Sequence, residues 1–143
     1  EAAGSPQRLA SMLRISLQAV WQWRRVPPLR VLQVEGATGV ALVDYTSGMA
    51  LGTMGGSKGF DLNVAAAGNT DVVRAKMRTM EHLGLKGQIE DILITLSDQY
   101  HLIRLISGRG GNGLFLYLVL DAKRSNLAMA RHQLRAIEND LEV

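Results

Sequence analysis

The sequence contains no cysteine and no long apolar run, and these two absences limit the kinds of protein it can be. Without cysteine there is no disulfide framework and no thiolate zinc site, which fits a reducing compartment. The longest apolar run, residues 114–120, has seven residues, whereas a membrane-spanning helix needs roughly 18 or more. We therefore expect a cytoplasmic protein that does not cross a membrane.

What the chain does contain is enough apolar residues for one core, together with unevenly placed charge. Of its 143 residues, 47% are hydrophobic, which suits a single globular core. Residues 1–35 hold five arginines against two glutamates, which accounts for the whole net charge of +3, and they also hold both tryptophans. A short segment rich in Arg and Trp indicates contact with a nucleic-acid backbone, and the rest of the chain is a neutral body.

The basic front segment is predicted to be helical. Ser5 and Pro6 form a typical helix start, which predicts a helix over about residues 6–14. Ser16 can cap a second helix over residues 17–25, which the prolines at positions 27 and 28 would end. A third short helix can then run through about residue 34. Two short helices joined by a tight turn are the physical content of a helix-turn-helix unit.

From residue 39 onward the pattern changes to strands and long helices. Residues 40–43 and 49–52 predict a hairpin with Gly48 at the position that needs a positive φ. Residues 62–83 predict a long helix, because apolar positions recur there at helical spacing. The members of this stripe are Leu62, Ala65, Ala66, Asn69, Val72, Val73, Met77, Met80 and Leu83.

Three strands and a helix are predicted to complete the body. The strands span residues 89–96, 100–107 and 113–120, and turns join them. The last strand is apolar on both faces, so we expect it at the centre of the sheet. Asn126 can cap a closing helix whose apolar positions recur at spacings of three and four.

This body resembles the roadblock or dynein light chain family over about residues 27–143. The resemblance rests on residues 36–44 leading through Ser47 and Gly48 to residues 49–51, and on the strand that ends in Leu120 and Asp121. It implies an α+β fold (β-β-α-β-β-β-α) in which a five-stranded antiparallel sheet has a long helix on one face and terminal helices on the other.

The same resemblance implies a homodimer and a regulatory function. In such a dimer the long helix and the third strand of each subunit pair across a two-fold axis. The residues that this places at the dimer interface are Val72, Val73, Lys76, Met80, Ile92 and Ile94. The resemblance also implies a scaffold or regulator, often of small Ras-like GTPases.

The front segment resembles the helix-turn-helix of phage repressors of the Cro type, over about residues 1–38. The resemblance rests on residues 5–13, 15–23 and 26–32. The helix that starts at Ser16 would enter the major groove, where Gln and Arg side chains contact bases and phosphates. The predicted DNA-binding residues are Ser16, Gln18, Trp21, Gln22, Arg24 and Arg25. The alternative is that the tryptophans are packing residues and the arginines are solvated.

Both resemblances make use of residues 27–38. A roadblock fold needs a first helix packed on its sheet, whereas a Cro-type domain uses the same residues as its closing helix. We divide the chain into a helix-turn-helix-like basic segment, residues 1–35, and a roadblock-like dimerisation domain, residues 36–143. The helix at about residues 27–36 either serves both units or belongs to a front that only caps the sheet.

Catalytic, metal and cofactor sites are not predicted. The glycine-rich residues 52–59 lack the second glycine and the hydroxyl residue of a phosphate-binding loop. The three histidines lie in different predicted elements and have no ligand at a neighbouring helical position. Glu90 and Asp91 alternate faces at the start of a strand, and we interpret them as a solvated strand end. We expect a protein that is not an enzyme and needs no cofactor.

The apolar residues of the predicted third strand indicate how the protein could assemble. An unprotected edge strand this hydrophobic would invite pairing with another chain, and the alternative is that the strand is internal.

The leading hypothesis is a homodimeric transcriptional regulator whose front binds DNA. The alternative is a scaffold or regulator of a small Ras-like GTPase without DNA binding.

Overall fold

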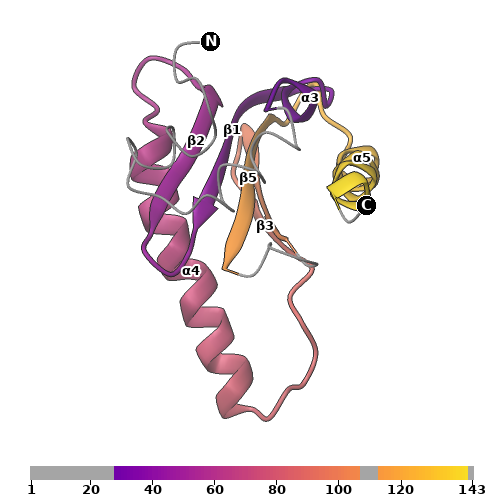
Figure 1. The fold of residues 1–143 in the computed structure, drawn as a ribbon. Helices are drawn as coiled ribbons and strands as arrows, with labels where there is room; N and C mark the ends of the chain where they lie inside the picture. Colours follow the sequence, from indigo (N-terminus) through magenta and orange to yellow (C-terminus); the bar gives the residue numbers. More distant parts are fainter. Residues whose placement is uncertain (1–27, 107–112, 142–143) are drawn as a thin grey trace.

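The computed structural model describes residues 28–106 and 113–141, which form one sheet and three helices (Figure 1). The order of elements along the described residues is the predicted one. The elements are α3 (Pro28–Leu32), β1 (Ala37–Asp44), β2 (Met49–Gly55), α4 (Leu62–His82), β3 (Asp91–Thr95), β4 (Gln99–Leu105), β5 (Leu114–Asp121) and α5 (Leu127–Leu141). None of the helices described is long and apolar enough to cross a membrane.

The five strands form one antiparallel sheet in the order β2-β1-β5-β4-β3. The apolar strand β5 lies at the centre, where residues 114–120 are all buried, which confirms the predicted place of this strand. β3 lies at one edge and pairs only with β4 among the described strands. The expectation of an edge strand is therefore confirmed, and the alternative of an internal strand is wrong.

The helices cover the sheet on both faces, as the predicted fold class requires. α4 lies on one face, and α3 and α5 lie on the other (Figure 1). On the α4 face, Leu62, Ala66 and Val73 pack with Phe115 and Tyr117. On the opposite face, residues of α3 and α5 pack with the other side of the same strands; the helix residues are Val31, Ala130, Leu134 and Ile137.

The short helix α3 packs on the sheet. Val31 is fully buried and Val34, just after the helix, is 3% exposed. Both belong to the core that α5 completes. The helix that both resemblances claimed therefore provides the first helix of the sheet domain, and residues 1–27, which would form the helix-turn-helix, lie outside the described residues.

Two helix starts and one tight turn explain the local structure around the sheet. Asp61 caps α4, because its carboxylate accepts hydrogen bonds from the backbone N–H of Asn63 and Val64. The predicted cap of α5 is confirmed, since the Asn126 side chain accepts from the N–H of Met129 at 3.0 Å. Gly48 has a φ of +81°, which confirms the predicted hairpin turn.

Candidate interaction surface

The helix α4 is longer than the sheet that it covers. Its fully buried residues end at Val73, and every side chain from Glu81 to Gln88 is exposed. In Figure 1 the C-terminal end of α4 extends well beyond the sheet, and the chain returns from there to β3. The end of α4 and the segment that follows it, from Glu81 to Gln88, therefore have no sheet of their own to pack on.

The apolar stripe predicted along α4 is therefore only partly right. Val72 is 38% exposed and Leu83 is 66% exposed, although both belong to the predicted stripe. Thr70 takes a buried position instead, because its hydroxyl donates a hydrogen bond of 2.8 Å to the backbone carbonyl of Ala66. The pattern identified the helix, but the length of the sheet decides how much of the stripe is covered.

The edge strand β3 presents apolar residues on the same face as α4. Ile92 and Ile94 are half-buried and belong to the core under α4. They pair with Ile103 and His101 of β4, so the side chains of these four residues lie next to one another on one face. The described part of the chain leaves uncovered both the outer edge of β3 and two apolar side chains of the α4 region, Val72 and Leu83.

A hollow of about 530 Å³ lies between the N-terminal half of α4 and the sheet. We call it the α4 hollow. Val64 and Gly68 of α4 form one wall, Phe60 lies beside the start of the helix, and the sheet contributes His101 and Tyr117. A Cβ atom placed on Gly68 would meet nothing within 4 Å, so the hollow is open at this position.

The polar groups at the hollow form a continuous hydrogen-bonded chain. His101 Nε2 lies 2.6 Å from Gln99 Oε1, and His101 Nδ1 lies 2.9 Å from the hydroxyl of Tyr117. Because the Gln99 oxygen can only accept, Nε2 carries the proton and Nδ1 accepts from the Tyr117 O–H. Asn69 bonds the Tyr117 hydroxyl in turn. These groups satisfy one another, which leaves the hollow with apolar walls.

Burial shifts the pKa values of His101 and Tyr117. Desolvation lowers the pKa of His101 below 6.5, and the negative charge of Asp98 opposes this shift. Burial raises the pKa of Tyr117 to about 12, although the hydrogen bond from Asn69 favours the phenolate. At neutral pH His101 is therefore an uncharged imidazole and Tyr117 an uncharged phenol, as the hydrogen-bonded chain requires.

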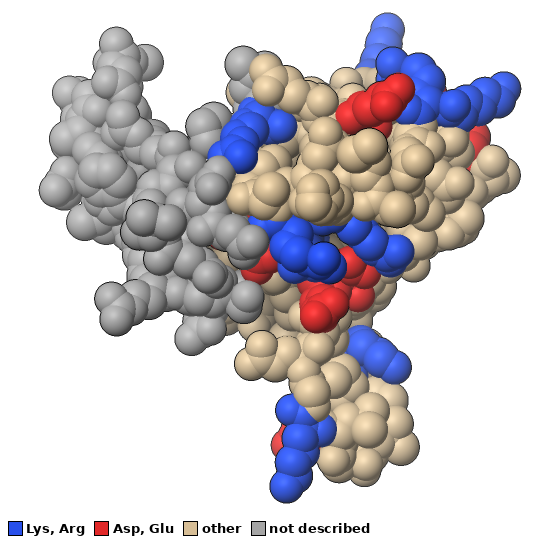
Figure 2. Space-filling view, turned by 90° about the vertical axis from the view of Figure 1, so that its right-hand side faces the viewer, with Lys and Arg blue, Asp and Glu red and all other residues tan. Residues whose placement is uncertain are grey.

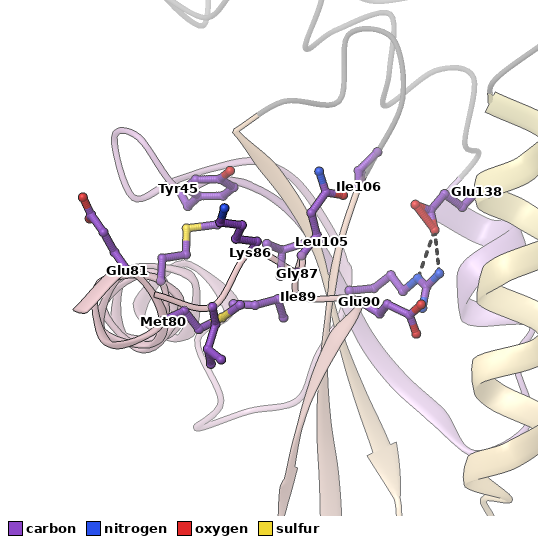
Figure 3. A pocket seen from close by; sticks show the side chains of 14 residues that line it. Tyr45, Met80, Glu81, Lys86, Gly87, Ile89, Glu90, Leu105, Ile106 and Glu138 are labelled. Carbon is purple, nitrogen blue, oxygen red and sulfur yellow. Dashed lines mark hydrogen bonds and ion pairs between the residues drawn. The ribbon is translucent and has the colours of Figure 1, made fainter. Parts of the chain in front are cut away.

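A second and larger cleft, of about 1010 Å³, lies under the distal half of α4 (Figure 3). Met80 and Glu81 of α4 lie on one side of it, and Tyr45 and Leu105 lie toward the sheet. The chain from Lys86 to Glu90 crosses beside it. This cleft exists because the helix extends past the sheet.

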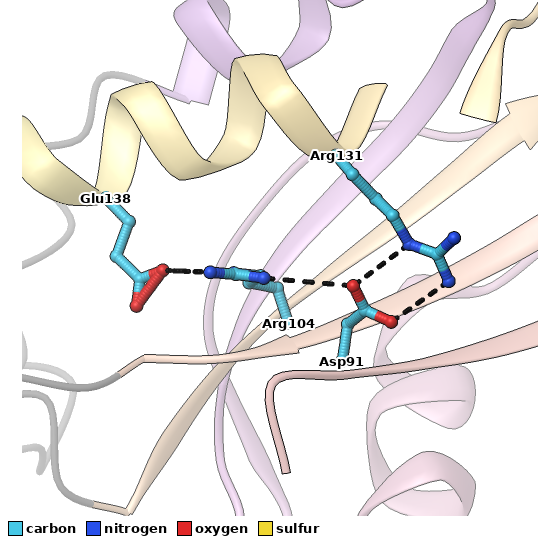
Figure 4. Close-up of polar contacts among 4 residues, drawn as sticks. All are labelled: Asp91, Arg104, Arg131 and Glu138. Atoms are coloured by element: carbon cyan, nitrogen blue, oxygen red, sulfur yellow. Dashed lines mark hydrogen bonds and ion pairs between the residues drawn. The ribbon is translucent and has the colours of Figure 1, made fainter. Parts of the chain in front are cut away.

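A network of four charged side chains joins α5 to the edge strand (Figure 4). Arg131 donates two hydrogen bonds to Asp91, of 3.0 and 3.1 Å. Arg104 donates to Glu138 at 3.0 Å and lies 3.8 Å from Asp91. The interpretation of Asp91 as a solvated strand end is wrong, because its side chain is only 14% exposed and has two arginine partners.

The charges on the surface are of mixed sign. In Figure 2 basic side chains lie beside acidic ones over the sheet domain, and basic side chains are also seen on the part that extends below it. Along α4 the two signs are separated by position. Residues 61–71 carry two acidic and no basic side chains, whereas residues 72–86 carry four basic and one acidic.

The structure places the predicted interface residues as follows. Val72 and Lys76 are exposed on α4, Met80 is half-buried beside the second cleft, and Ile92 and Ile94 lie on the edge strand. Val73 is fully buried under α4. The assignment of Val73 to the dimer surface is wrong, because one residue corresponds to about 100° around a helix and only Val72 turns outward.

The six predicted DNA-binding residues lie within residues 1–27, outside the described part of the chain. Their assignment stays a prediction.

Among the residues that are described, no group of three or more His, Cys, Asp or Glu side chains could hold a metal ion. The sequence did not predict the hydrogen-bonded chain through His101 and Tyr117. The only signal for it was that both residues lie on predicted strands, and these two strands, β4 and β5, are neighbours in the sheet.

No family profile matches the sequence, and no curated protein matches it. The fold, in contrast, is similar to solved structures. Myxococcus xanthus MglB superposes with a TM-score of 0.71 at 16% identity, covering 84% of this chain and 86% of that one. The gliding protein MglB from Thermus thermophilus gives a TM-score of 0.69 at 17% identity, covering 85% of this chain and 88% of its own.

A third neighbour carries the name of the family in its description. It is a Roadblock/LC7 domain from Streptomyces avermitilis, with a TM-score of 0.67 at 12% identity, covering 81% of this chain and 91% of that domain. At such identities the similarity concerns the fold alone. The strand order of this chain agrees with that fold, and so do the long helix on one face of the sheet and the terminal helices on the other. The chain therefore has the roadblock fold.

Proposed function

We propose that the protein is a non-enzymatic, homodimeric regulator of a small Ras-like GTPase and that it acts in the cytoplasm. The observation that carries the proposal is the roadblock fold across most of the chain, with an apolar edge strand that has no partner on its outer side among the described residues. The resemblance of residues 27–143 to the roadblock family points to the same kind of regulator. The named neighbours support the regulation of a small GTPase more than they support DNA binding.

The edge strand and α4 support the homodimer. Among the described residues no strand pairs with the outer edge of β3, which leaves its backbone N–H and C=O groups available, and Ile92 and Ile94 of this strand are half-buried. A second copy paired edge to edge would satisfy those backbone groups and continue the sheet across a two-fold axis. It would also bring a second α4 beside the first and cover residues such as Val72.

The arrangement of polar side chains supports a function without catalysis. Catalytic groups need an acid, a base or a nucleophile that is available to a substrate in a cleft. The groups at the α4 hollow are already bonded to one another, and the buried arginine and carboxylate groups are paired under α5. The features that remain available to a binding partner are surfaces of the protein.

The test is direct binding to purified GTPases. Small Ras-like GTPases encoded in the same genome are loaded with a fluorescent GDP or a fluorescent non-hydrolysable GTP analogue, and the chain is titrated in. We expect saturable binding to one of them, stronger in one nucleotide state than in the other. Absence of binding to every GTPase, in both states, would contradict the proposal.

A DNA arm of the same experiment tests the competing hypothesis. Fluorescent genomic fragments are titrated across a salt series with the natural chain and with a variant that carries both Arg24→Ala and Arg25→Ala. Binding that falls steeply with salt and is lost in the variant, without binding of a GTPase, would favour a transcriptional regulator.

A further inference from the structure

We propose that the outer edge of β2 is a second interface, which pairs with β2 of another copy of this chain. β2 and β3 lie at opposite edges of the sheet (Figure 1), so this contact is separate from the homodimer proposed above and does not depend on it. Among the described strands β2 pairs only with β1. The backbone groups on its outer side therefore form a template for an added strand.

The chain around β2 lacks the residues that usually keep edge strands apart. No charged residue and no proline occurs from residue 45 to residue 57, a stretch that begins before β2 and ends after it. Natural proteins commonly protect an edge strand with a charged side chain or a proline. The opposite edge has such a residue, because β3 begins with Asp91. By this criterion β2 is the less protected of the two edges.

Two methionines of β2 present apolar surface at this edge. Met49 is 50% exposed and Met54 is 37% exposed. Met54 pairs with Val40, whose side chain belongs to the core under α5, and Met49 pairs with Asp44, four residues further along β1. Because side chains alternate along a strand, both methionines lie on the face of the sheet that α3 and α5 cover. A strand added at the edge would bury more of both side chains.

The register of β2 makes this edge complementary to a second copy of itself. The β1–β2 register shifts by one residue between Leu42 and Val43, which leaves Leu51 without a partner in β1. An antiparallel pair of β2 strands with its two-fold axis between Leu51 and Gly52 would place Met49 opposite Met54 of the second copy. These two side chains lie on the same face of the sheet, as cross-strand neighbours must.

The other face gives the same match. In this register Ala50 lies opposite Thr53 of the second copy. Ala50 pairs with Val43 and Thr53 pairs with Ala41, and both of these β1 residues belong to the core under α4. A shift of one residue in either direction would instead oppose side chains from different faces. A second copy of the chain is therefore an occupant that fits the edge on both faces.

The β2 contact has a consequence for the size of the assembly. The homodimer proposed above would use β3 and leave a free β2 edge at each end of its continuous sheet. Such dimers would join end to end through β2, so the average mass would rise with concentration. Without that homodimer, the β2 contact alone would give a dimer. The two contacts can therefore be tested separately.

Two double variants at the same positions test the register. Met49→Lys with Met54→Lys, the like-charge variant, would place two ammonium groups opposite each other in both symmetric pairs. Met49→Lys with Met54→Glu, the opposite-charge variant, is the matched control, because each pair would then join opposite charges. We expect the like-charge variant to associate through β2 more weakly by roughly tenfold or more in sedimentation equilibrium. Both positions are exposed, so circular dichroism should show both variants folded.

Disulfide cross-linking tests the same contact, because the natural chain has no cysteine. Chains with Met49→Cys and chains with Met54→Cys are mixed in equal amounts and oxidised. We expect a linked dimer in the mixture. Met49→Cys alone is the matched control, because its two copies would lie about 16 Å apart along the paired strands, which is too far for a disulfide.

The possible results separate this inference from the proposed homodimer. A mass that rises beyond a dimer in the natural chain, and stops at a dimer in the like-charge variant, supports both contacts. A natural dimer that becomes monomeric in the like-charge variant supports the β2 contact and contradicts the homodimer.

Two results would overturn the β2 contact. The first is a natural dimer that neither cross-links in the mixture nor differs between the two double variants, and in this case the homodimer stands. Pairing of β2 with another segment of the chain, or with another protein, would give this result. The second is a natural chain that remains monomeric at high concentration, which would overturn both contacts.

Discussion

Arg131 of α5 and Asp91 of the edge strand β3 are joined by two hydrogen bonds, although 40 residues separate them in the sequence. Arg104 lies between Asp91 and Glu138, so the chain of charges runs from the edge strand to the far part of α5. The position of β3 therefore depends on charged side chains as well as on apolar packing, and this strand forms the edge that the proposed dimer uses.

Glu138→Ala should destabilise the protein strongly. It would remove the closer of the two carboxylates beside the guanidinium of Arg104, which is 9% exposed, and leave only Asp91 at 3.8 Å; removing one partner of a buried ion pair costs up to about 3–5 kcal/mol. The free energy of unfolding in urea measures the effect. The matched control is Glu81→Ala on the exposed surface of α4, where a change within about 0.5 kcal/mol is expected. Equal effects of the two variants would contradict the role given to the network.

Gly55→Ala should destabilise the sheet at the end of β2. Gly55 has a φ of +79°, and an added Cβ would lie 2.6 Å from the backbone oxygen of Thr38. Gly84→Ala isolates the backbone contribution, because Gly84 also has a positive φ but its Cβ would meet nothing within 4 Å. We expect about 1 kcal/mol of destabilisation for Gly84→Ala and clearly more for Gly55→Ala, measured by thermal unfolding. A loss at Gly55 no larger than that at Gly84 would show that the strand can shift.

His101 should make the protein less stable in mild acid. Its pKa is lowered in the folded state, so the unfolded chain binds a proton more readily. The stabilisation is fully present above the unfolded pKa of 6.5 and is lost as the pH falls toward the lower folded pKa. We expect the urea midpoint to fall less between about pH 8 and pH 5 in His101→Gln than in the natural chain. The matched variant is His82→Gln, which replaces an exposed histidine on α4.

Tyr117 should ionise only at strongly alkaline pH while the protein is folded. Burial raises its pKa to about 12 from the usual value of 10, so the folded state holds this proton longer than the unfolded state does. Stability should therefore fall as the pH rises above about 10. Near-ultraviolet absorbance should show a late phenolate transition that is absent in Tyr117→Phe. A late transition that persists in the variant would assign it to another tyrosine.

The fold was largely predictable because periodicity reports which positions are buried. The apolar run of β5 predicted a central strand, and the spacing from Leu62 to Val73 predicted the covered half of α4. What periodicity cannot report is where the sheet ends. Leu83 continues the stripe yet is exposed, because α4 extends past its sheet, whereas Val72 is exposed because it turns away from the sheet beside the buried Val73.

The candidate surface was harder to predict than the fold. Asp91 stands next to Glu90 in a polar pair, and only the approach of Arg104 and Arg131 from distant segments makes it a buried ion-pair partner. His101 and Tyr117 are likewise separate in sequence and meet because β4 and β5 are neighbours. Such contacts depend on the register of strands and helices, which local patterns do not contain.

In the proposed homodimer, the overhang of α4 would tie helix formation to assembly. Short helical segments without tertiary contacts are marginal in water, and the last turns of α4 have few contacts within their own subunit. The backbone amides of residues 76–82 should therefore exchange with solvent faster than those of residues 66–73 in dilute protein, and slow down as the concentration rises. Part of the binding free energy would then be spent on ordering those turns, so the helical content of the protein would report how many subunits are paired.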